Sequence, residues 1–491
     1  MRSIADRPLR LAASCLTGLL LAGCATPDAR MGDPNQPGRI EQLMDPGSEV
    51  PVALRPVIAS DRLEGERNRV LNEALAGLTA LELHDPALAQ RLLADAQAQI
   101  ETIYADNPAA NEARSKFVPE AHKDFKGDPY ERAMVGYYLA LADFSDTDLD
   151  NARADLRFAE LQDTMSADEV YQSDMVIMPY LRGWLYNCSG EPQRAADEFK
   201  LVTQGKPGIK LPGKDDNVLL IGEVGSAPGK YATGRYREEL RYRRTDDGHI
   251  QGVSFVHGTQ PLFGQQIEDV YWQAATRGGR AVDKILAGKA SFRDTAENIA
   301  TGAAIISHIS SDLAQDAMRR NNSDDAQQYA GLALLGAAVS IGSDLVAAAT
   351  RAEADTRAWS TLPDRIYVAT THLKDLDDAS AWSLGFHDAQ GRLQRAVEMK
   401  TFRSGACLLV WGQQYPDASE LWSDSTERHA SALAPTCQEG CKAVTEQIEL
   451  DRKHFAEPEA APAPAAAPVV EQPVNAPPRL LRRRILLTPG N

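Results

Sequence analysis

The sequence lacks the short motifs that mark common hydrolases. It contains no Gly-x-Ser-x-Gly elbow and no His-Glu-x-x-His helix, and its nine histidines are scattered. The first motif exposes a nucleophilic serine on a tight turn, and the second sets two histidines on one helix face to bind zinc. We therefore expect no catalytic residue, no cofactor and no metal site. An enzyme with an unrecognised site remains the less favoured alternative.

The sequence also has fewer basic residues than acidic ones. The chain of 491 residues has 52 Lys and Arg against 69 Asp and Glu, a net charge of -17. Nucleic-acid binding needs a basic face to attract phosphate, so a general nucleic-acid partner is excluded. A basic-aromatic cluster at residues 236–244 is interrupted by Glu238 and Glu239 and is typical of a solvated strand edge, although it would also suit an anionic surface.

No apolar run is long enough for a membrane span. A helix needs about 20 apolar residues to cross a bilayer core. The run at 11–21 is much shorter, and the glycine-dotted run at 330–343 ends at Asp344 after 14 residues. The second run therefore favours a buried core helix.

The N-terminus has the pattern of an exported lipoprotein. Three arginines precede the apolar run at 11–21, and Leu21-Ala22-Gly23-Cys24 follows, which resembles the bacterial lipobox. This order predicts a signal peptide at 1–23 and acylation of Cys24, with enough lipid to hold the mature protein stably at a membrane. Ala25, where an aspartate would favour inner-membrane retention, favours the outer membrane facing the periplasm. The alternative is an ordinary secreted protein with an accidental cysteine.

Of the six cysteines, Cys15 belongs to the predicted signal peptide and Cys24 is the predicted acylation site. The other four leave several disulfide pairings open. In an oxidising compartment Cys437 and Cys441 are candidates for a local disulfide, or each of them pairs with Cys188 or Cys407. Too few histidines lie nearby to favour a zinc site.

Composition divides the chain into six segments. The signal peptide is followed by a leash at 24–60, rich in Pro, Gly and Asp, which we expect to be flexible. The C-terminal end at 456–491 is an Ala/Pro-rich tail with a basic tip, expected to be disordered. The segments between them are a helical domain at 61–204, a mixed α/β domain at 205–415 and a helical segment at 416–455.

Three stretches of the helical domain share one internal spacing. In each, four small or apolar residues are separated by 12, 4 and 3 positions, and a turn lies between the first and the second. Such a spacing lets two antiparallel helices pack closely, because a small residue on the first admits the second. It predicts three helical hairpins that resemble tetratricopeptide repeats, with an ordinary helical domain as the alternative. The three sets are Gly77, Ala89, Leu93 and Ala96; Ala140, Ala152, Leu156 and Ala159; and Gly183, Ala195, Phe199 and Val202.

Stacked hairpins commonly present a binding surface to another protein. Large polar and aromatic side chains on the predicted hairpins are therefore the candidate partner-binding residues: Tyr137, Tyr138, Arg182, Trp184 and Tyr186.

The mixed domain has several strand-like runs. They lie at 218–221, 252–256, 365–370, 382–386, 393–402 and 407–411, with Asp388-Ala389-Gln390-Gly391 as a hairpin turn. We expect a small β-sandwich-like unit with helices packed against it, so the fold class is α+β and mainly helical. Residues 225–230 superficially match a phosphate-binding loop, but the spacing is too short and Tyr231 replaces the magnesium-binding hydroxyl. A structural turn with an exposed Lys230 is the better interpretation.

Three segments together resemble a poorly characterised family of proteobacterial lipoproteins with tetratricopeptide-like helices. The resemblance implies a cell-envelope lipoprotein without assigned catalysis, acting in envelope assembly. In the third segment we expect Trp359 to anchor a helix end against the sheet and Pro363 to stop that helix before a strand. The segments are Phe125-Lys126-Gly127-Asp128-Pro129-Tyr130-Glu131-Arg132, Leu220-Ile221-Gly222-Glu223-Val224-Gly225-Ser226-Ala227-Pro228-Gly229-Lys230 and Ala354-Asp355-Thr356-Arg357-Ala358-Trp359-Ser360-Thr361-Leu362-Pro363.

These observations predict a membrane-anchored periplasmic adaptor that binds another envelope protein and catalyses nothing. The alternative is a structural component or a binder of surface polysaccharide or peptidoglycan. The partner and the oligomeric state are left open by the sequence.

Overall fold

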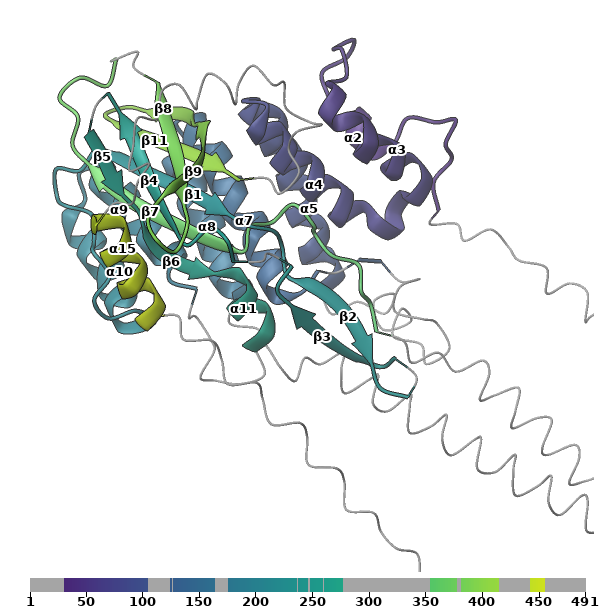
Figure 1. Cartoon of the computed structure of the whole chain (residues 1–491). Helices are drawn as coiled ribbons and strands as arrows, with labels where there is room; N and C mark the ends of the chain where they lie inside the picture. Colours follow the sequence, from purple (N-terminus) through teal and green to yellow (C-terminus); the bar gives the residue numbers. More distant parts are fainter. Residues whose placement is uncertain are drawn as a thin grey trace, which may run out of the picture. The chain divides into compact units, whose positions relative to one another are not determined.

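A computed structural model describes ten stretches of the chain, which belong to one compact unit within residues 1–455 (Figure 1). No helix among these stretches is long and apolar enough to cross a membrane. The predicted signal peptide, Cys24, the apolar run at 330–343, both Cys437 and Cys441, and the tail lie outside them. The described stretches are 31–104, 124–125, 127–163, 175–235, 237–245, 248–258, 260–276, 354–377, 381–414 and 442–454.

The predicted flexible leash is wrong for residues 39–60. This part of the chain forms α2 (Arg39–Leu43), the short 3-10 helix η1 (Val52–Leu54) and the start of α3 (Arg55–Glu64). Ile40 and Leu54 are completely buried, and Asp61 accepts a hydrogen bond of 2.9 Å from the backbone of Ile40. Proline and glycine set the turns here, but the few apolar side chains between them are enough to bury the segment.

The three predicted helical hairpins are present. A second 3-10 helix, η2 (Gly65–Asn68), leads into the first pair, α4 (Arg69–Glu82) and α5 (Pro86–Tyr104). The second pair is α7 (Pro129–Ser145) with α8 (Leu149–Asp163), and the third is α9 (Ile177–Cys188) with α10 (Pro192–Gly205).

The three hairpins share one turn geometry. His84, Thr147 and Gly190, each seven residues after the first position of the repeated spacing, all have φ between 61° and 73°. In each turn the next residue donates its N–H to a carbonyl five residues back, as in Asp85 to Ala80. This is the Schellman arrangement that ends a helix with a left-handed residue.

The glycines of the repeated spacing are needed for helix contact. A Cβ on Gly77 would lie 2.6 Å from Leu93, and one on Gly183 would lie 2.3 Å from Phe199. Both partners are the third members of their sets, which the spacing predicts to continue the buried stripe of the second helix. The close-packing explanation of the spacing is therefore confirmed at these two hairpins.

The central sheet has five strands in the order β10-β11-β1-β7-β6, in which β1 and β11 are parallel and the other pairs are antiparallel. A four-stranded antiparallel sheet has the order β5-β4-β8-β9, and β2 pairs with β3 as a separate hairpin. The strands are β1 (Val218–Val224), β2 (Gly229–Thr233), β3 (Glu239–Arg243), β4 (Gly252–His257), β5 (Gln260–Phe263), β6 (Gln265–Asp269), β7 (Arg365–Thr371), β8 (Trp382–His387), β9 (Leu393–Glu398), β10 (Lys400–Ser404) and β11 (Cys407–Gln413).

One predicted strand, at 393–402, is two strands. It breaks at Met399, whose N–H donates to the carbonyl of Trp382 and whose side chain is buried. The chain crosses there from the four-stranded sheet into the five-stranded sheet. The hairpin turn at 388–391 is confirmed, with Gly391 at φ 74° and Asp388 accepting hydrogen bonds from the turn backbone.

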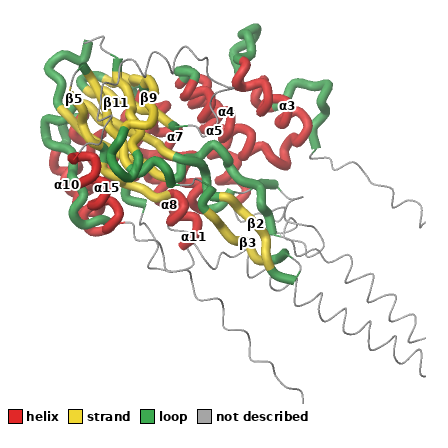
Figure 2. Tube along the Cα trace, viewed as in Figure 1, coloured by secondary structure: helices red, strands yellow, loops and turns green. Residues whose placement is uncertain are grey.

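The five-stranded sheet lies between the helices and the second sheet. Alternate residues of β1 point to opposite faces. Leu219 and Ile221 join the core with the helices, whereas Val218 and Leu220 join a second core with Phe255 and the other inner residues of the four-stranded sheet. The fold is thus α+β, with helices and strands in separate layers (Figure 2). Two further helices complete the unit. α11 (Val270–Thr276) directly follows β6, and α15 (Lys442–His454) lies against β4.

The expected helix end at Trp359 is not formed, since residues 354–364 are irregular. Trp359 is nevertheless buried, and its ring lies 5.7 Å from that of Tyr138 on α7. Its indole N–H donates to Thr361 at 3.0 Å. Trp359 therefore anchors a loop, and not a helix, against the helical layer.

Candidate functional site

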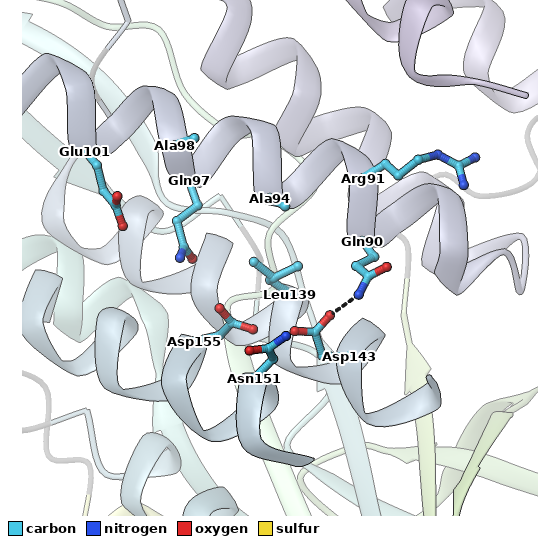
Figure 3. A pocket seen from close by; sticks show the side chains of 10 residues that line it. All are labelled: Gln90, Arg91, Ala94, Gln97, Ala98, Glu101, Leu139, Asp143, Asn151 and Asp155. Atoms are coloured by element: carbon cyan, nitrogen blue, oxygen red, sulfur yellow. Dashed lines mark hydrogen bonds between the residues drawn. The ribbon is translucent and has the colours of Figure 1, made fainter. Parts of the chain in front are cut away.

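A groove lies between the first and second hairpins, with a volume of about 370 Å³ (Figure 3). Its walls are α5 on one side and α7 with α8 on the other. Most of its lining side chains are polar. They are Gln90, Arg91, Ala94, Gln97, Ala98, Glu101, Leu139, Asp143, Asn151 and Asp155.

The hairpin geometry brings two carboxyl groups of the groove together. Asp143 lies in the last turn of α7 and Asp155 in the second turn of α8, twelve residues later. On the opposite wall Gln90 and Gln97 are seven residues apart, so both lie on one face of α5. The Gln90 amide donates to Asp143 Oδ1 at 2.6 Å.

The carboxyl pair is poorly solvated. Asp143 is 4% exposed and Asp155 is 7% exposed. Burial, reinforced by the neighbouring carboxyl of Asp143, raises the pKa of Asp155 to about 8, and burial also raises the pKa of Asp143. Two carboxyl groups so placed hold one proton between them near neutral pH, since ionising both would leave like charges in contact.

The pair has unused hydrogen-bonding capacity. Oδ2 of Asp155 is buried without a donor, and so is Oε1 of Gln97. Even if the Gln97 amide turns its NH2 group toward Asp155, two carboxyl groups offer more acceptor sites than two glutamines can fill. Arg91 does not supply the missing donors, because its side chain points away in Figure 3 and donates to the carbonyl of Leu43 at 2.8 Å.

The lining of the groove combines the carboxyl pair with an apolar wall. None of the ten lining residues is a Ser, Cys, His or Lys that would act as a nucleophile beside the carboxyl pair. Leu139, Ala94 and Ala98 give the groove an apolar wall beside the charged end. A ligand with hydrogen-bond donors and an apolar stem matches this lining.

The five predicted partner-binding residues are not at this groove, and their prediction is wrong. Each of them is buried, with an exposed fraction of 7% or less. They pack inside the helical layer and against the sheet, and their polar atoms are satisfied internally. Tyr137 and Tyr138 donate to Glu223, Arg182 pairs with Glu198, the Trp184 indole donates to the carbonyl of Asp216, and Arg153 lies over the ring of Tyr186.

The exposed position predicted for Lys230 is also wrong. Its side chain is only 2% exposed, and its ammonium lies 2.7 Å from Asp128 Oδ2 and 2.6 Å from Glu131 Oε2. Burial alone would lower the pKa of Lys230, but the two carboxylates outweigh it and hold that pKa above its ordinary value. Tyr242 also donates to Asp128, at 2.8 Å.

This buried cluster joins the three segments that carry the family resemblance. Asp128 and Glu131 belong to the first, Lys230 to the second, and Trp359 of the third donates its N–H to Glu131 Oε1 at 2.9 Å. Glu223, also in the second segment, accepts hydrogen bonds from Tyr137 and Tyr138 of α7. Burial raises the pKa of Glu223 to about 7, against the lowering effect of those hydrogen bonds. The three segments thus form the internal junction between helices and sheet.

The cysteine alternatives are partly resolved. Cys188 and Cys407 form a disulfide that ties the end of α9 to the start of β11. Neither is then free for Cys437 or Cys441, whose own pairing lies outside the described residues. No group of three or more potential metal ligands occurs among the residues that the structure describes.

One hydroxyl–imidazole pair was not singled out from the sequence. Ser254 Oγ lies 2.8 Å from His387 Nε2, and His387 Nδ1 lies 3.1 Å from the carbonyl of Gly391. A serine and a base in this relation can form a nucleophilic pair. Both residues are completely buried, however, so a substrate has no access to the hydroxyl.

Comparison of the chain with family models, curated proteins and solved structures finds no match. Function is therefore inferred from the groove itself.

Proposed function

We propose that the protein is a non-catalytic adaptor of the cell envelope, which holds a segment of another envelope protein in the groove between its first two hairpins. The observation that carries this proposal is the groove of about 370 Å³, with Asp155 Oδ2 buried in its lining without a donor. A buried polar atom left unpaired costs free energy that a bound partner recovers.

Two features of the fold fit this role. The three hairpins with their common turn support a tetratricopeptide-like stack, a class that binds partners on an extended concave surface. The two sheets share a core, which supports a sandwich-like unit, and the Cys188–Cys407 disulfide ties the third hairpin to the central sheet. We further propose that acylated Cys24 tethers this unit to the periplasmic face of the outer membrane.

Site-specific photo-crosslinking in cells tests the proposal. A photoreactive amino acid is introduced at Ala94 or Ala98, both exposed in the groove, and at Ala196, an exposed alanine of α10 outside it. We expect one defined protein adduct from the two groove positions and none from Ala196. Equal labelling at all three positions, or retention of the purified protein on cell wall without any protein adduct, would reject the adaptor in favour of the wall-binding alternative.

A further inference from the structure

We propose that the groove takes up the side chain of a lysine or an arginine from an extended segment of the partner, with its cationic head between Asp143 and Asp155. This inference rests on the proposed adaptor function and adds the chemistry by which the groove selects its partner.

The head of the ligand must carry several hydrogen-bond donors. Asp155 Oδ2 and Gln97 Oε1 are buried without a donor among the described residues, and Asp143 accepts from Gln90 and shares the proton of the pair with Asp155. A hydroxyl group brings a single donor, whereas an ammonium brings three and a guanidinium five. A cation also gains from charge-assisted hydrogen bonds to the carboxylates, which are about twice as strong as neutral ones.

The stem of the ligand must be apolar and slender. Leu139 is 4% exposed at the base of the groove, and Ala94 and Ala98 leave space along α5. The methylene chains of lysine and arginine pack on such surfaces while the charged head reaches a polar site. Asn151 and Glu101 lie at the groove as well, so a peptide backbone would meet polar groups on its rim.

The charges that face the pair favour a cation and oppose an anion. From the turn between α7 and α8, Asp146 and Asp148 add negative charge near Asp143. From α5, Glu101 adds another, and Arg91, the one cation of the lining, is held by the carbonyl of Leu43 and by Asp45. A carboxylate or a phosphate placed in the groove would therefore meet repulsion from every wall.

Binding of a cation must displace the proton that the pair holds. Each bound side chain then releases up to one proton near neutral pH, and affinity rises with pH until the pair ionises unaided.

The test uses the full chain in detergent and four blocked peptides, acetyl-Gly-Ala-X-Ala-Gly-amide, in which X is arginine, lysine, citrulline or glutamate. We expect the arginine and lysine peptides to bind at least about tenfold more tightly than the citrulline peptide, because citrulline keeps the shape of arginine without its charge. Titration calorimetry in two buffers of different ionisation enthalpy should show proton release on binding at pH 7.

Matched variants locate the effect. Asp143→Asn and Asp155→Asn keep the side-chain shape and should each weaken the arginine peptide at least about tenfold. Asp197→Asn makes the same charge change on an exposed residue of α10 outside the groove and should change affinity less than about twofold. Thermal melting of each variant checks that the fold is kept.

The outcomes separate this inference from the adaptor itself. Equal binding of the arginine and citrulline peptides, no binding of either, or an equal effect of Asp197→Asn and Asp155→Asn would overturn the cationic ligand. If crosslinking at Ala94 and Ala98 still captures a defined partner in that case, the adaptor stands and only the ligand chemistry is wrong. If the peptides discriminate as expected but no partner crosslinks, the groove is cation-selective and the adaptor is rejected.

Discussion

The ammonium of Lys230 lies 2.6 Å from the carboxylate of Glu131, a residue 99 positions earlier in the chain. Both side chains are 2% exposed. Through this contact the first strand of the β2–β3 hairpin is joined to the first turn of α7, where Glu131 also caps the helix by accepting the N–H of Asp128 at 2.7 Å. The Lys230–Glu131 ion pair therefore connects a helix to a strand in the interior of the protein and does not line the groove.

Replacement of this lysine should strongly destabilise the fold. Lys230→Met keeps the stem but leaves Asp128 and Glu131 as buried charges without their cationic partner, which costs about 3–5 kcal/mol. Urea unfolding followed by circular dichroism measures the loss. The control is Lys214→Met, at an exposed lysine, for which we expect a change within about 0.5 kcal/mol. Similar losses in the two variants would contradict the assigned role of Lys230.

Glu223 should make the protein less stable as pH rises toward neutrality. Its pKa is about 7 in the folded protein and about 4.3 in an unfolded chain, so the folded state binds the proton more tightly. The resulting stabilisation is complete below pH 4 and is lost as pH rises through 7. Glu223→Gln should reduce the slope of unfolding free energy against pH between 4.5 and 7, and the raised pKa values of Glu73, Asp155 and Asp451 keep the remaining slope. A slope identical to that of the parent protein would show that Glu223 does not carry this linkage.

The Cys188–Cys407 disulfide should contribute to stability by restricting the unfolded chain. It closes a loop across a sequence separation of 219 residues. Removal of a native disulfide typically costs about 2–5 kcal/mol. The Cys188→Ser/Cys407→Ser variant should therefore unfold at lower denaturant concentration than the parent, and added reductant should lower the parent to the level of the variant. A further decrease of the variant in reductant would point to a second stabilising disulfide.

The left-handed turn residue of the second hairpin offers a stabilising change. Thr147 has φ 61°, a conformation that costs a β-branched residue about 1–2 kcal/mol and glycine almost nothing. Thr147→Gly should raise the free energy of unfolding by about 1 kcal/mol. The reverse change at the equivalent position of the third hairpin, Gly190→Ala, should lower it by about 1 kcal/mol. Destabilisation by Thr147→Gly would mean that its side chain contributes more than its backbone strain costs.

The hairpins were predictable because their signal is local. The steps of 12, 4 and 3 residues describe contacts between neighbouring helices, and the turn residues lie between them in the sequence. Which face of a hairpin then packs on the sheet depends on strands that are far away in the chain. Because local spacing does not show which face packs on the sheet, the sequence predicts Tyr137 and Trp184 on a binding surface, whereas both are buried.

The groove depends on packing that no local step in the sequence predicts. Asp143 and Asp155 lie on the two helices of one hairpin, and their contact follows from how α7 and α8 pack. Their burial could not be predicted, because α5 of the preceding hairpin supplies the opposite wall. The partner of Lys230 was equally hidden, since its carboxylates lie about 100 residues away and no periodic pattern connects them.

One comparison tests most directly whether the groove is the partner site. A photoreactive amino acid is placed at Ala98 in the parent chain and in the Asp155→Asn variant, and the yield of the crosslinked partner is measured at equal expression. Our account predicts a single protein adduct in the parent and a loss of most of it in the variant, with Ala196 giving none in either. The same adduct at undiminished yield in Asp155→Asn, or no adduct at Ala98 in the parent, would contradict it.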